Sequence, residues 1–155
     1  MSRLIAILLI LTFAAPLGAQ SSPGSHDIAR VGECVQTHAA RGSQAQVLSR
    51  CTEIIAGACR GGTTIEIADC LMRETAAWDA WLNAWWAPMR ARAKANGTWD
   101  RLLASQRRWI TERDAECHRA YDSAGGGSIR VIYGAACQRD LTARKAVEFY
   151  FSLYR

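Results

Sequence analysis

The sequence has no segment in which polar and apolar residues alternate over several positions, so we expect no sheet. It contains three histidines, and no spacing of cysteine and histidine is typical of a zinc site. There is no Gly-x-Ser-x-Gly motif, and the glycine-rich residues 124–128 lack the lysine and the spacing of a phosphate-binding P-loop. We therefore expect no metal and no cofactor, and we predict that the protein is not an enzyme.

The sequence also lacks a block of consecutive basic residues. The chain of 155 residues carries 19 lysines and arginines against 14 aspartates and glutamates, for a formal net charge of +5. Nearly all of the positive charge is arginine, and acidic residues are interspersed with it. Proteins that follow a nucleic-acid backbone usually show a basic patch or stripe. We therefore expect no nucleic-acid partner.

Residues 1–19 have the features of a signal peptide. Arg3 supplies the positive charge, residues 4–13 form an apolar run, and Ala19 ends a small-residue cleavage site. The run is too short to span a bilayer, although a retained anchor helix is an alternative. No cysteine for lipid attachment follows it. We predict a periplasmic or secreted protein, with membrane contact that is at most peripheral.

All six cysteines follow the predicted cleavage point, and an even number in an exported chain favours disulfides. Six cysteines permit fifteen pairings, which the symmetry of helical hairpins can rank. Two cysteines at equal distances from the turn of an antiparallel pair face each other. The predicted pairs are Cys34 with Cys51, Cys59 with Cys70, and Cys117 with Cys137.

Apolar residues recur at helical spacing through most of the chain. The pattern predicts helices over residues 28–40 and 44–58, a helix from Ile65 that Pro88 kinks or ends, and two long helices on either side of residues 124–128. The expected N-caps are Asp27, Thr63 or Thr64, Thr98 or Asp100, and Ser128. We predict an all-α, disulfide-stapled bundle of antiparallel helical hairpins. Residues 20–26 are expected to be disordered, and residues 27–155 to form one domain, with an N-terminal hairpin over 27–58.

Several motifs resemble the bacterial LprI-like family, which is named for a lysozyme inhibitor. They are Cys59 and Cys70, then Asp79-x-x-Leu82-Asn83, then Trp109-Ile110-x-x-Arg113-Asp114-Ala115-Glu116-Cys117, then Gly127-Ser128, and finally Cys137 with Leu141-Thr142-x-Arg144. The resemblance covers roughly residues 59–149 and places the family domain within residues 59–155. It implies inhibition of lysozyme in the cell envelope. Trp86 and Pro88 depart from the ordinary polar helix that the family usually has there.

Arg113 lies on the apolar stripe of its predicted helix, where an unpaired charge is costly. We expect it to form a structural ion pair with Asp79 or Asp140.

Two surfaces are candidates for binding. Lysozymes are typically basic, so a positively charged inhibitor needs a local acidic patch. Glu112, Asp114 and Glu116 are candidates for that patch. The second candidate is an aromatic platform of Trp81 and Trp86, if these side chains are exposed.

Other interpretations of the tryptophans and of the function remain open. The tryptophans can simply fill the core of an alanine-rich bundle. If they are exposed, they can bind peptidoglycan, or an anionic membrane surface together with Arg90, Arg92 and Lys94. Another envelope protein can be the partner instead of lysozyme. A small-ligand protein or an enzyme is a further alternative, whose mark would be one pocket with perturbed carboxylates.

Overall fold

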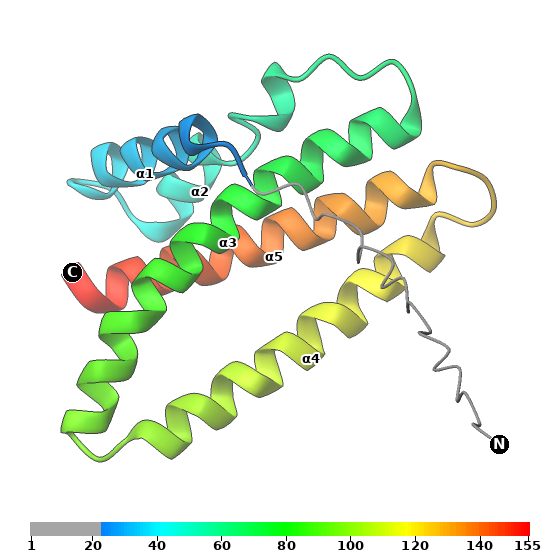
Figure 1. The fold of residues 1–155 in the computed structure, drawn as a ribbon. Helices are drawn as coiled ribbons and strands as arrows, with labels where there is room; N and C mark the ends of the chain where they lie inside the picture. Colours follow the sequence, from blue (N-terminus) through cyan, green and yellow to red (C-terminus); the bar gives the residue numbers. More distant parts are fainter. Residues whose placement is uncertain (1–22) are drawn as a thin grey trace, which may run out of the picture.

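The computed structural model describes residues 23–155, which form helices and contain no strand. In chain order the elements are α1 (Ser25–Ala39), α2 (Gln44–Cys51), the short 3-10 helix η1 (Ala56–Ala58), α3 (Thr64–Ala95), α4 (Trp99–Ser123) and α5 (Arg130–Tyr154). Figure 1 shows that α4 runs antiparallel to both α3 and α5, while α1 and α2 lie on one side of α3. The predicted all-α fold is confirmed. The predicted signal peptide lies outside the described residues.

The three disulfides are the three predicted pairs. Cys34 of α1 bonds to Cys51 of α2, Cys59 to Cys70 of α3, and Cys117 of α4 to Cys137 of α5. Their Cα atoms are 5.7, 5.9 and 5.3 Å apart, which suits a disulfide. Each bridge closes a short loop and contributes about 3 kcal/mol in the chain-entropy model.

The first helix begins earlier than predicted. Its N-cap is Gly24, so Ser25 and His26 are helical rather than disordered, and Asp27 is not the cap. Asp27 is instead buried and binds Arg73 of α3, with Arg73 Nη2 donating to Asp27 Oδ1 at 2.8 Å. The hydrogen bond from Arg73 holds the pKa of the Asp27 carboxyl below its ordinary value, although burial raises it.

The connection after α2 also differs from the prediction of one helix over residues 44–58. The helix ends at Cys51, and Glu53 adopts a positive φ of 70°. The reason lies on α3, where the fully buried carboxylate of Glu74 accepts backbone N–H groups from this turn. The donors are Glu53 at 2.7 Å, Ile55 at 3.0 Å and Ala56 at 2.8 Å. A continuous helix would have used these N–H groups internally.

The third helix starts as predicted and continues beyond the predicted break. Thr63 and Glu66 form a capping box, and the N–H of Gly62 together with Thr63 lowers the pKa of Glu66. The helix contains Pro88 and ends only at Ala95. Figure 1 shows its C-terminal part turning away from the rest, so the predicted kink is present while the predicted end is not. No helix between residues 23 and 155 has both the length and the hydropathy that a membrane crossing needs.

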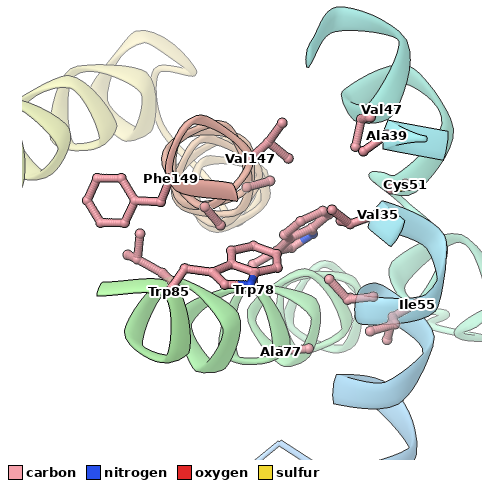
Figure 2. Close-up of a cluster of buried hydrophobic side chains, with 14 residues drawn as sticks. Val35, Ala39, Val47, Cys51, Ile55, Ala77, Trp78, Trp85, Val147 and Phe149 are labelled. Atoms are coloured by element: carbon pink, nitrogen blue, oxygen red, sulfur yellow. The ribbon is translucent and has the colours of Figure 1, made fainter. Parts of the chain in front are cut away.

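The main core lies where α3, α5 and the N-terminal hairpin meet. Trp78 is fully buried and Trp85 is 4% exposed. Figure 2 shows these rings between α3 and α5, with the cluster of Val35, Val47 and Ile55 to one side of them. The hairpin can approach α3 closely because Gly32 has no side chain. A Cβ at this position would stand 2.2 Å from Cζ2 of Trp81, which is too close.

The C-terminal hairpin has the predicted antiparallel form with a different cap. Gly125 and Gly127 have φ values of 71° and 89°, which glycine adopts without strain. The N-cap of α5 is Ile129 rather than Ser128, and no side chain caps this helix.

We expect Glu74→Gln to lower the free energy of unfolding by about 2–4 kcal/mol, since an amide replaces a buried carboxylate that satisfies three backbone donors. Urea denaturation of the oxidised protein measures this. Glu33→Gln on the exposed side of α1 is the control and should change stability by less than about 0.5 kcal/mol. Equal effects of the two substitutions would contradict this role of Glu74.

We expect the effect of Asp27→Asn to depend on pH. Because the folded pKa of Asp27 is depressed, the ion pair contributes fully above the unfolded pKa of about 4 and is lost as pH falls through the folded value. The variant should be less stable at neutral pH by about 1–3 kcal/mol, a difference that shrinks in acid. Urea unfolding over a series of pH values tests this, and a pH-independent difference would refute it.

Candidate functional site

The predicted ion pair of Arg113 is present with a different partner. Its guanidinium lies 2.8 Å from Oδ1 of Asp114 and over the ring of Trp109, 5.0 Å from the centroid. Asp79 instead accepts a hydrogen bond from Asn83 at 2.9 Å. Asp140 pairs with Arg139, not with Arg113. The predicted partners were wrong, because Asp114, the next residue on the same helix, forms the ion pair with Arg113.

The other motif residues divide between the core and the surface. Leu82, Leu141 and Thr142 are buried, whereas Arg144 is exposed. Gly127 forms the turn between α4 and α5. The three buried positions therefore support the fold.

Trp81 and Trp86 do not form one exposed platform. Trp81 stacks on Trp85 at 5.0 Å and donates its indole N–H to the carbonyl of Ile28 at 2.7 Å. Trp86 lies against α5 and α4, stacked on Phe149 at 5.7 Å and 5.9 Å from Trp99. Both rings are half-buried and pack against the core. The space-filling interpretation of the tryptophans fits this arrangement.

The predicted acidic patch divides into two parts on α4. Glu112 and Glu116 lie one turn apart and share one face of the helix, and both are exposed. Neither has an ion-pair partner within 4 Å among residues 23–155. Asp114 lies two positions from each, and so it points to a different side of the helix. We call Glu112 and Glu116 the acidic face.

Asp114 borders a groove between three helices. The groove has a volume of about 450 Å³ and is open to solvent. It is lined by Ala68 and Met72 of α3, by Asp114, Cys117, His118 and Tyr121 of α4, and by Val131, Gly134, Ala135 and Gln138 of α5. We call it the three-helix groove. Its lining is mainly apolar with a polar rim, as is common for sites that bind another molecule.

Two features give this groove its shape. A Cβ at Gly134 would stand 3.4 Å from Tyr121, at van der Waals contact, so the Tyr121 side chain packs against α5 beside the third disulfide. At the rim, Asp122 accepts from Arg130 at 3.2 Å and pairs with His118 at 2.8 Å. The guanidinium of Arg130 also stacks over Tyr121 at 4.0 Å.

Of the residues that line the groove, the sequence had indicated only Asp114 as a binding residue, and Met72, Tyr121 and Gly134 are among those that it did not indicate. A signal existed for Gly134, because an isolated glycine in a helical pattern often marks close packing. Met72 and Tyr121 occupy ordinary positions in the apolar stripes of their helices, so the sequence does not distinguish them from core residues. Within residues 23–155, no group of three or more histidine, cysteine, aspartate or glutamate side chains is placed to hold a metal ion.

The fold and this site define an all-α domain, stapled by disulfides, that presents a groove and an acidic face on its C-terminal hairpin. Residues 56–149 match the family model of the lysozyme inhibitor LprI, which is more than half of the chain. The chain therefore belongs to the LprI family, and the predicted resemblance is confirmed. No curated protein and no solved structure matches the chain.

We expect dilute hydrogen peroxide to oxidise Met72 several times faster than Met89. Met72 is 45% exposed in the open groove, whereas Met89 is half-buried against the core, and exposure governs the oxidation of methionine. Mass spectrometry of peptides over a time course measures both rates in one sample. Equal rates would show that the groove is closed in solution.

Proposed function

We propose that this protein is an exported inhibitor of lysozyme that acts in the cell envelope without catalysing a reaction. Membership of the LprI family supports this proposal. The three disulfides also support it, because such bonds persist in oxidising compartments outside the cytoplasm. The predicted signal peptide at residues 1–19 is part of the proposal.

Charge decides which surface is suited to lysozyme. The chain is positively charged overall, and lysozymes are typically basic, so most orientations of the two proteins bring like charges together. The charge of α4 reverses along its length. Residues 99–110 carry three arginines and one aspartate, whereas residues 111–123 carry four acids and two arginines. The second half of α4 is therefore the part best suited to a basic partner.

The main support for this proposal is the acidic face, which is suited to contact a basic partner. Glu112 and Glu116 lie within the family domain, are exposed, and have no ion-pair partner between residues 23 and 155 that must be displaced. The three-helix groove opens on the same half of α4, where it can accept an apolar side chain. Protein interfaces commonly combine an apolar centre with a charged rim that steers association. We propose that the groove and the acidic face serve these two roles.

We expect the double variant Glu112→Gln/Glu116→Gln to need about three to ten times more protein for half-maximal inhibition of lysozyme, because two rim charges are lost. The assay follows the clearing of a cell-wall suspension by lysozyme in the presence of oxidised residues 20–155. The effect should be larger at low salt, where surface charges are less screened.

The matched control is Glu33→Gln/Asp100→Asn, which removes the same charge from α1 and from the other end of α4. It should inhibit like the unsubstituted protein. Unchanged inhibition by the Glu112/Glu116 variant would reject the acidic face. Absence of any protection by the unsubstituted protein would reject lysozyme as the target.

A further inference from the structure

Three segments far apart in the sequence contain no acidic residue at all. They are residues 34–52, 80–99 and 149–155. Together they carry six arginines and lysines: Arg41, Arg50, Arg90, Arg92, Lys94 and Arg155. Their charge is therefore not balanced locally, unlike the interspersed charges of the rest of the chain.

The fold brings these segments to one end of the molecule. Arg155 donates to the carbonyl of Ala40 at 2.8 Å, which joins the C-terminus to the turn between α1 and α2. Arg92 donates to the carbonyls of Ser152 at 2.9 Å and Leu153 at 3.3 Å, which joins the end of α3 to the end of α5. Figure 1 shows the C-terminus, this turn and the end of α3 on the same side. We call this region the basic end.

The cations of the basic end are available for binding. Arg41, Arg50, Arg90 and Lys94 are exposed, and within residues 23–155 none has a carboxylate within 4 Å. In the part of the chain that the structure describes, Arg92 and Arg155 donate to backbone carbonyls and form no ion pair with a carboxylate. A hollow of about 500 Å³ at this end is lined by His38, Arg41, Gly42, Gln46, Ser49 and Arg50, with no acid among them.

An aromatic side chain accompanies the charges. Tyr154 is 58% exposed next to Arg155, and its ring lies 5.0 Å from that of Tyr150. Tyrosine is enriched at the boundary between a bilayer and water, where its ring is apolar and its hydroxyl is hydrated. Clusters of arginine and lysine bind anionic lipid headgroups through charge.

We propose that the basic end binds the phosphate headgroups of an anionic lipid bilayer. The charges come from three segments at one end rather than from a continuous track, which suits a surface better than a nucleic-acid strand. Docking in this way leaves the acidic face free, because Glu112 lies about 20 Å along α4 from Trp99, where α4 leaves the basic end. The proposal does not depend on lysozyme inhibition.

The test is co-sedimentation of oxidised residues 20–155 with vesicles of phosphatidylcholine, with and without phosphatidylglycerol. Binding is expected only with phosphatidylglycerol and should weaken as salt is added. The double variant Arg41→Gln/Arg90→Gln should bind about tenfold or more weakly, since each basic residue near such a surface is worth about fivefold. Both side chains are exposed and make no hydrogen bond in the described structure, so the fold is not at risk.

The matched control, Arg60→Gln/Arg119→Gln, removes two exposed arginines that lie outside the basic end and should keep its affinity. Equal loss in both double variants would show that only net charge matters and would overturn the proposal. Binding to vesicles without phosphatidylglycerol would overturn it as well. A third arm uses duplex DNA at the same ionic strength, and tighter binding to DNA with the same loss in Arg41→Gln/Arg90→Gln would assign the basic end to nucleic acid instead.

Discussion

The buried carboxylate of Glu74 holds the two parts of this structure together. It takes up three N–H groups of the turn after α2 and lies 3.3 Å from the indole nitrogen of Trp78. Backbone N–H groups that are buried without a partner would cost free energy. The turn after α2 can therefore pack against the core because the Glu74 carboxylate accepts its N–H groups. This turn directs α1 and α2 back onto α3. The N-terminal hairpin, which lies outside the family match, thereby shares one core with the family domain.

A second constraint is the distribution of charge along the long helices. A small basic protein can still present an acidic surface if its charges are separated, and α4 separates them by reversing sign near its middle. The acidic face and the three-helix groove lie on the second half of α4, while the basic end includes the end of α3, which leads into the first half of α4. In the proposals above, the two regions contact partners of opposite charge. Because they lie well apart, binding at one leaves the other accessible.

Sequence reasoning succeeded where local rules decide the outcome. The capping box of Thr63 and Glu66 involves neighbours in the chain, and the Cys117–Cys137 bridge follows from equal distances to a glycine turn. It failed where several carboxylates were possible partners of one arginine. Arg113 could reach several carboxylates in principle, and only the packed structure shows that Asp114 is the one it contacts. The exposure of Trp81 likewise depends on Gly32, which is distant in the chain.

Helical periodicity and cysteine spacing by themselves determined that this protein is an all-α bundle with three particular disulfides, because both depend on residues that are close in sequence or symmetric about a turn. The motifs were also sufficient to indicate the LprI family. Only the tertiary structure decided where α2 ends, which residues line the three-helix groove, and that six cations converge at one end. These features depend on contacts between helices, and the direction of a side chain relative to another helix is not encoded in the periodicity of either one.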